Sequence, residues 1–135
     1  MFTEKEIRYM AEQHLCRVAT AQPDGTLQVS PVGFSYNPGT CTIDLLGLRL
    51  STSRRFRNVA DNGRIALVID DVPSTDPWRV RSLEIRGHAE ALTGVPTPEQ
   101  YDNAMICVHP HRIIAIGVED WDLDYTRQIP HSRTV

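Results

Sequence analysis

Alternating apolar and polar side chains make residues 82–91 the clearest predicted element of this sequence. A period of two residues is the pattern of a β-strand with one buried face. One face of the predicted strand is small or apolar: Leu83, Ile85, Gly87, Ala89 and Ala91. The other face is polar or charged: Ser82, Glu84, Arg86, His88 and Glu90. The first of these faces is therefore expected to line a core.

Five further segments are predicted as strands: Leu15–Ala21, Leu27–Tyr36, Cys41–Gly47, Arg64–Asp70 and Ile113–Val118. Turns at 23–25 (Pro-Asp-Gly) and 37–39 (Asn-Pro-Gly) connect the first three into an antiparallel meander. The segments Arg64–Asp70 and Ile113–Val118 are apolar on both sides, so both of their faces must be buried. A partner subunit can bury the second face. The pattern predicts a mainly β fold, a six-stranded antiparallel barrel with short helices, that forms a homodimer.

Three helices are predicted around the strands. Residues 3–6 (Thr-Glu-Lys-Glu) form a capping box that opens a helix ending near His14. A second helix is predicted over residues 53–63, with Ser53 as its cap and Asn-Gly at its end. Thr97 is expected to cap a third helix, because a proline follows it at the first helical position.

Length and composition indicate one globular domain over residues 1–135, with a core of about 6–121 and an aperiodic tail over 122–135. No apolar run approaches the roughly 20 residues that span a bilayer, and the acidic start is unlike a signal peptide. The three cysteines (Cys16, Cys41 and Cys107) have no CxxC spacing and are expected to be reduced, mostly buried thiols of a cytoplasmic protein. A net charge of −3 argues against nucleic-acid binding.

Positive charge is concentrated in the segment Leu48–Asn58, LRLSTSRRFRN. Arg54, Arg55 and Arg57 fall in the first turn of the predicted second helix, where each opposes the helix dipole by about 0.3–1 kcal/mol. A bound phosphate would turn this unfavourable interaction into a favourable one. Its oxygens can accept hydrogen bonds from free helix N–H groups, from an arginine and from hydroxyls. Three hydroxyl residues precede the arginines: Ser51, Thr52 and Ser53. The segment is therefore a candidate anion site.

The alternative for this segment is a solvated arginine face with Asp61, Asp70 or Asp71 as ion partners.

A second ambiguous segment is Ser30-Pro31-Val32-Gly33, where proline implies an edge or bulge and glycine a close approach by a ligand or another backbone. A bend at a barrel corner explains that segment equally. Gly87 allows the same two interpretations.

Other candidate residues carry weaker signals. His109-Pro110-His111 has no third ligand nearby, so no metal site is predicted. His88 is expected to be solvated or hydrogen-bonded. Trp78 is expected to plug the barrel rim, with a stacking surface for a planar ligand as the alternative. No nucleophile triad, GxGxxG or P-loop motif is present.

The order of these segments resembles the pyridoxamine-phosphate-oxidase-like split β-barrel superfamily, over roughly Glu6 to Val118. Four stretches carry the resemblance: residues 15–38, residues 50–71, residues 83–92 and residues 111–118. The short chain and the segments RRFRNVADNGRIAL and WRVRSLEIRGHAEA look closest to the deazaflavin (F420)-dependent reductases, in the branch that includes tetracycline-pathway reductases. A C-terminal substrate motif of true pyridoxamine phosphate oxidases is absent.

The resemblance implies a cofactor at a dimer interface. Arg55 takes the place of the family's phosphate-binding Lys or Arg, with Ser51, Thr52, Ser53 and Arg54 beside it, and Asn58-Val59 matches the family's Asn-aliphatic pair. Val29, Ser30, Pro31 and Val32 match the strand that lies along the isoalloxazine-type ring. Arg57 or Arg49 is expected to hold an oligoglutamate tail. No catalytic side chain is assigned.

Three functions follow from this resemblance. The first is an F420-dependent reductase that transfers a hydride to a conjugated C=C or C=N bond of a small organic substrate. The second is an FMN-binding flavin reductase or oxidase of the same fold, and the third a non-catalytic cofactor or haem carrier. Substrate choice is expected to depend on rim loops at Asp71–Trp78 and after Trp121, and the role of Arg133 is open.

Overall fold

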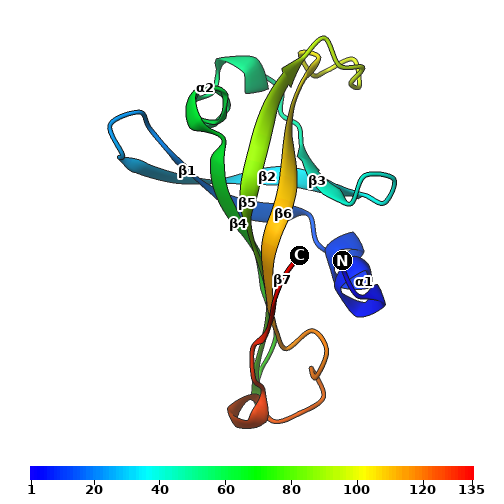
Figure 1. Cartoon of the computed structure of the whole chain (residues 1–135). Helices are drawn as coiled ribbons and strands as arrows, with labels where there is room; N and C mark the ends of the chain where they lie inside the picture. Colours follow the sequence, from blue (N-terminus) through cyan, green and yellow to red (C-terminus); the bar gives the residue numbers. More distant parts are fainter.

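The structure is a computed structural model that describes all 135 residues, and antiparallel strands dominate it (Figure 1). The strands are β1 (Leu15–Ala21), β2 (Leu27–Asn37), β3 (Thr42–Leu45), β4 (Arg64–Thr75), β5 (Trp78–Thr93), β6 (Ala104–Ile116) and β7 (His131–Thr134). They form one sheet in the order β3-β2-β1-β4-β5-β6-β7, which a further β3–β6 pairing closes into a ring. The predicted mainly β, antiparallel split-barrel class is confirmed.

The core is built from side chains that alternate inward along each strand. Val18 of β1 pairs with Leu67 of β4, which pairs with Ile85 of β5, which pairs with Ile113 of β6. None of these four side chains is more than 2% exposed. Burial of each contributes about 1.5–3 kcal/mol relative to exposure. This row fixes the register of four strands, because a one-residue slip would turn every member outward.

Strand β2 changes partner along its length. It pairs with β1 over Leu27–Gly33 and with β3 over Phe34–Asn37. Over Leu27–Gly33, no strand pairs with the edge of β2 that faces away from β1. Pro31 is tolerated inside a continuous strand because it lies in this half-paired stretch. The split of the barrel is therefore an open backbone edge at residues 27–33.

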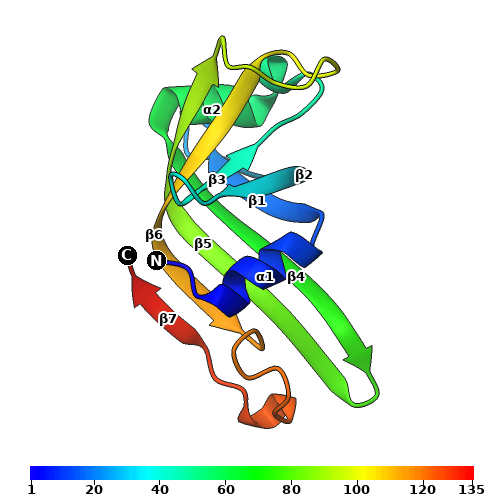
Figure 2. The same ribbon diagram turned by 90° about the vertical axis from the view of Figure 1, so that its right-hand side faces the viewer.

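Two α-helices lie on opposite sides of strands β1 to β3, with α2 above them and α1 below them in both views (Figure 2). Helix α1 (Glu4–Glu12) begins with the predicted capping box at Thr3. Helix α2 (Arg54–Asn62) begins at the predicted cap Ser53 and ends at Gly63, whose φ of 69° is left-handed. Both caps are confirmed.

The helix predicted from Thr97 is wrong. Residues 94–103 connect β5 to β6 without a helix. The Thr97 hydroxyl accepts from the backbone N–H of Asn103 at 3.1 Å and donates to the Asn103 side chain at 3.2 Å. Thr97 therefore links the two ends of the loop instead of capping a helix. Asn103 has a left-handed φ of 55°. A connection this short offers no apolar face for a helix to bury.

Strand β6 begins at Ala104, not at Ile113 as expected, and it runs through Pro110. The β5–β6 register shifts between Arg86 and Gly87, opposite Pro110, so the proline lies at a bulge. A Cβ on Gly87 would lie 2.0 Å from the carbonyl oxygen of His109. The backbone of β6, and not a ligand, therefore requires the glycine.

The hairpin of β4 and β5 extends over most of the segment expected to be a rim loop. Strand β4 continues to Thr75 and β5 starts at Trp78. Trp78 pairs with Thr75 at the end of this hairpin and is 46% exposed. The tip of the β4–β5 hairpin lies well away from α2 (Figure 2). It does not plug its own barrel, which corrects that expectation.

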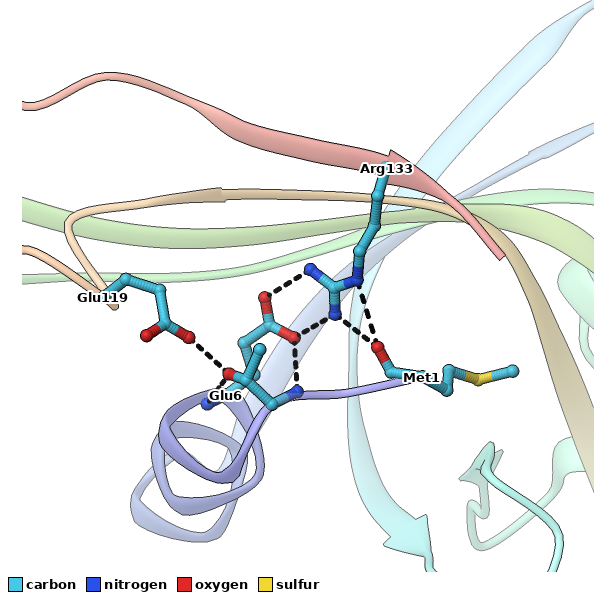
Figure 3. A network of polar contacts seen from close by, with 5 residues as sticks. Met1, Glu6, Glu119 and Arg133 are labelled. Carbon is cyan, nitrogen blue, oxygen red and sulfur yellow. Dashed lines mark hydrogen bonds and ion pairs between the residues drawn. The ribbon is translucent and has the colours of Figure 1, made fainter.

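The tail is ordered by backbone pairing. Strand β7 pairs with β6 and makes the sheet seven-stranded, one strand more than predicted. A short 3₁₀ helix, η2 (Tyr125–Arg127), precedes it. Arg133 of β7 donates to the carboxylate of Glu6 and to the carbonyl of Met1, so the two ends of the chain lie side by side (Figure 3). The sheet therefore continues into the tail beyond residue 121, although no side chain after Val118 belongs to the buried core.

Candidate functional site

The hydroxyls of the three residues that precede α2 all donate hydrogen bonds to acceptors in their own chain. The 3₁₀ helix η1 (Leu50–Thr52) runs directly into α2. The Ser51 hydroxyl donates to Asp102 at 2.6 Å, and the Thr52 hydroxyl donates to the carbonyl of Arg49 at 3.0 Å. The Ser53 hydroxyl donates to the carbonyl of Leu50 at 2.7 Å. These hydroxyls can donate to an anion only by exchanging these bonds.

Backbone amides at the start of α2 remain as donors. The first N–H groups of a helix have no intrahelical carbonyl partner. In α2 the N–H of Phe56 donates to the Ser53 hydroxyl at 3.2 Å, and that of Arg57 donates to the Ser53 carbonyl at 3.2 Å. The amides of Arg54 and Arg55 make no hydrogen bond within the chain. No acidic residue lies in this first turn.

Arg55 connects the two segments that the sequence analysis assigned to the cofactor. Its Nη2 donates to the hydroxyl of Ser30 in β2 at 3.1 Å. Its Nε is buried and has no hydrogen-bond partner. A buried donor without an acceptor costs about 1–3 kcal/mol, so this atom is expected to meet an acceptor group. An anion at the start of α2 would supply one.

The arginines of α2 do not pair with aspartates. Asp70 pairs with Arg17 at 2.9 Å, and Asp71 pairs with Arg81 at 2.6 Å. None of the ion pairs in the chain involves an arginine of α2, and Asp61 bonds only to the neighbouring Asn62. The ion partners expected in the alternative interpretation are therefore wrong, whereas its solvated arginine face remains compatible with the structure. Arg54 and Arg57 are exposed and unpaired.

The open edge of β2 lies beside Arg55. The four predicted ring-contact residues are Val29, Ser30, Pro31 and Val32, all within the half-paired stretch of this strand. Ser30 and Val32 point toward the barrel interior, while Val29 and Pro31 point outward and are exposed. A planar ligand along this edge would meet free backbone groups, with the Arg55–Ser30 contact at its side.

Asn58 lies beneath α2 and not at its surface. It is 1% exposed, and its Nδ2 donates to the hydroxyl of Thr20 in β1 at 3.0 Å. Its Oδ1 is buried without a partner, as is Oε1 of Gln28, which faces Thr20 across β1 and β2. Asn58 therefore holds α2 against the sheet, and its predicted contact with a cofactor stays a prediction.

The thiol of Cys16 is fully buried, close enough to Arg55 for the two groups to interact electrostatically. Burial raises the pKa of this thiol to about 11, and the nearby Arg55 guanidinium offsets only part of the effect. Cys16 is therefore a packed, uncharged group at neutral pH. All three cysteines are free, although Cys41 and Cys107 are only half-buried, contrary to the expectation of mostly buried thiols.

Sequence reasoning missed Asp102. Its carboxylate accepts from both the amide and the hydroxyl of Ser51, at 3.0 and 2.6 Å. The two residues are 51 positions apart. No local pattern could indicate this contact, because it depends on how the β5–β6 connection folds back over η1.

The histidines of β5 and β6 are engaged with one another. The rings of His88 and His109 stack with centroids 4.9 Å apart, and Nε2 of His109 lies 2.6 Å from the carboxylate of Glu90. The chain contains no group of three or more His, Cys, Asp or Glu side chains arranged to hold a metal ion. Arg133, whose role was open, contacts the N-terminus of its own chain.

The three main hollows on the surface are not lined by Arg55. A groove of about 620 Å³ lies against the sheet, with a floor that includes Ala19 and Ala66 and a rim that includes Arg64 and Arg86. One chain therefore presents an open strand edge and a charged helix start beside Arg55, and its three main hollows lie elsewhere. No helix has the length and apolar character needed to cross a membrane.

Comparison with known proteins gives a family and a fold. The family described as pyridoxamine 5'-phosphate oxidase matches residues 3–122. A curated protein of Streptomyces rimosus named 5a,11a-dehydrotetracycline/5a,11a-dehydrooxytetracycline reductase is 42% identical over 120 residues, which cover 87% of this chain and 84% of that protein.

Two solved structures have the same fold at low identity. A heme-binding protein from Mycobacterium smegmatis has a TM-score of 0.68 and 15% identity; the match covers 99% of this chain, which spans 59% of that protein's length. A structure described as an F420 reductase has a TM-score of 0.56 and 23% identity, and the match covers 73% of this chain and 86% of that one.

Proposed function

Because the chain belongs to the pyridoxamine 5'-phosphate oxidase family, we propose that it is a reductase that uses the deazaflavin F420. The relative of Streptomyces rimosus that is 42% identical carries the name of a reductase, which supports an oxidoreductase. Its name also supports a small conjugated organic substrate, reduced at a C=C or C=N bond. FMN in place of F420 is the alternative that the experiment below distinguishes.

The orphaned donor of Arg55 is the observation that carries this proposal. Its buried Nε lacks an acceptor at the point where α2 begins and β2 has an open edge. A phosphate there would accept from Arg55 and from the amides of Arg54 and Arg55, with the positive end of α2 behind it. F420 carries such a phosphate between its polyol chain and an oligoglutamate tail. The donor set therefore fits the group.

Each part of the site then has a role in binding and orientation. Arg55 would fix the phosphate, and the exposed Arg54 and Arg57 would add charge for the phosphate and the tail. The edge of β2 at Val29–Val32 would orient the ring through its backbone groups. When bound, the deazaflavin supplies the hydride, so the protein needs to position the ring and exclude water more than to supply an acid or base.

We also propose that a second copy of the chain completes the site, in the cytoplasm, where the three free thiols stay reduced. Leu27 and Val29 are 76% and 68% exposed on the outer face of β2. Val29 pairs with Ala19 of β1, which pairs with Ala66 of β4, so an apolar strip runs outward from the open edge. Such a patch is typical of an interface. Light scattering after size-exclusion chromatography measures the dimer directly.

Titration of the purified protein with F420, with FMN and with haemin, each followed by fluorescence quenching, tests the function. Micromolar or tighter binding of F420 with much weaker binding of FMN supports the proposal. Preferential binding of FMN would instead indicate a flavin reductase or oxidase. Tight haemin binding with a Soret band, without binding of either flavin, would indicate a carrier and overturn the proposal.

A further inference from the structure

Asp102 saturates the donors of Ser51. One carboxylate oxygen, Oδ2, accepts from both the amide and the hydroxyl of that residue. These hydrogen bonds hold the pKa of Asp102 below its ordinary value, so the side chain is charged at neutral pH. Ser51 therefore meets a fixed negative charge of the protein and has no donor left for a ligand.

The connection that carries Asp102 is fixed in place. Residues 94–103 fold back on themselves through the bonds between Thr97 and Asn103 and through a bond from the amide of Val95 to the carbonyl of Asn103, at 3.1 Å. Ala104, where β6 begins, is 1% exposed. Asp102 is thus held over η1 between two anchored segments, although its own side chain is exposed.

Asp102 lies near the start of α2. Ser51 precedes the helix cap Ser53 by two residues, a separation of at most about 7.6 Å between Cα atoms. Arg49, Arg54, Arg55 and Arg57 lie within or just before the first turn of α2, Asp102 contacts Ser51, and Asp24 at the β1–β2 turn interacts with Arg54. Arg54 is among the groups that lower the pKa of Asp24, after its hydrogen bonds with Thr26. A phosphate at this helix start has arginines and a carboxylate as neighbours.

We propose that Asp102 is a specificity-determining residue that disfavours a phosphomonoester relative to a phosphodiester at this site. A monoester carries a charge of about −1.5 to −2 at pH 7. A diester carries a single charge. Repulsion from a fixed carboxylate rises with the charge of the ligand, so Asp102 penalises FMN more than the singly charged phosphodiester of F420. The inference rests on the proposed function, because it requires the phosphate to bind at the start of α2.

The expected size of this effect is modest. For one extra unit charge at an assumed separation of about 8 Å, with an effective dielectric constant of about 45–80, Coulomb's law gives a roughly two- to five-fold change in affinity. High salt should reduce it, because the Debye length falls to about 3 Å at 1 M. The change is large enough to measure as a ratio between two ligands.

The test compares FMN with its methyl phosphodiester, which has the same ring and one charge less, and with riboflavin. Dissociation constants at pH 8 are measured for the wild type and for Asp102→Asn, which keeps an acceptor oxygen for Ser51 and removes the charge. The control is Asp124→Asn. Asp124 caps η2 and accepts from the amide and hydroxyl of Thr126 at 2.9 and 2.6 Å. The segment that precedes β7, drawn in orange to red, lies far from α2 (Figure 1).

Asp102→Asn should raise the affinity for FMN two- to five-fold more than that for the diester and leave riboflavin unchanged, about the Coulomb estimate above. Asp124→Asn should change neither. An unchanged ratio in Asp102→Asn, or the same change in both variants, overturns the inference. If the wild type binds these flavins but not F420, the proposed function fails while the ratio still tests Asp102. Absence of all binding overturns both.

Discussion

Arg133 in the last strand makes a two-pronged ion pair with Glu6 in the first helix, with Nη2 to Oε1 at 2.5 Å and Nη1 to Oε2 at 3.1 Å. The Glu6 side chain is fully buried, and that of Arg133 is 31% exposed. The Glu6 carboxylate also accepts from the amide of Thr3 (Figure 3). One buried charge thus joins the capping box of α1 to the C-terminal strand.

Replacing Arg133 by methionine should therefore destabilise the protein by about 3 kcal/mol, because it leaves the buried Glu6 carboxylate without its counter-charge. The measurement is urea unfolding followed by circular dichroism. The matched comparison is the double variant Glu6→Gln with Arg133→Met, which should lose less than the sum of the two single changes. Strict additivity would show that the two groups do not stabilise each other.

Gly87→Ala should prevent β5 from pairing with β6. Its Cβ would meet the carbonyl oxygen of His109 at 2.0 Å, and backbone cannot move aside as a flexible side chain can. Gly33→Ala is the control, because a Cβ at Gly33 meets nothing within 4 Å. We expect soluble folded protein from the second variant and little from the first. Equal stability of both would contradict the bulge at Pro110.

These glycines illustrate which parts of the fold could be predicted. Local sequence patterns were sufficient to predict the helix caps at Ser53 and Gly63 and the strand β1, because residue types and spacing within a few positions determine such features. The reason for Gly87 lay in the backbone of a distant strand. The sequence left open whether Gly87 accommodates a close ligand or backbone or a bend at a barrel corner, because a single sequence does not reveal which segment packs against the glycine.

Elements held by backbone pairing or by long-range contacts could not be predicted in the same way. Strand β7 has no apolar periodicity that would predict it. It is held in place instead by its backbone pairing with β6 and by the contacts of Arg133. Thr97 has the pattern of a helix cap, but its hydroxyl bonds to Asn103. In the candidate site, Arg55 and Ser30 were both predicted, while their contact and the role of Asp102 depend on the folded chain.

Thr20→Val should weaken the attachment of α2. It removes the acceptor of the Asn58 Nδ2 group, which is then buried without a partner at a cost of about 1–3 kcal/mol. Unfolding in urea measures the loss, and amide hydrogen exchange should report faster opening of α2 than of β5. A variant as stable as the wild type would indicate that Asn58 finds another partner.

Stability below pH 5 should depend on Asp71. Burial alone would raise the pKa of this carboxyl, but hydrogen bonds from Arg81 and Tyr9 hold it below its ordinary value. The contribution of a depressed carboxyl pKa is complete above its unfolded value of about 4 and is lost as pH falls through the folded value. Asp71→Asn should therefore flatten the fall of unfolding free energy below about pH 5. Parallel pH profiles for variant and wild type would refute this assignment.

The most direct test of the cofactor site is the affinity of Arg55→Ala for F420 and for the phosphate-free deazaflavin, with Arg127→Ala as a control on an exposed arginine remote from α2. A lost charge-assisted contact of about 1.5–3 kcal/mol predicts a roughly 10- to 100-fold weaker F420 complex. Binding of the phosphate-free deazaflavin should stay unchanged, and Arg127→Ala should match the wild type. Equal weakening for both ligands, or none for F420, would contradict a phosphate site at Arg55.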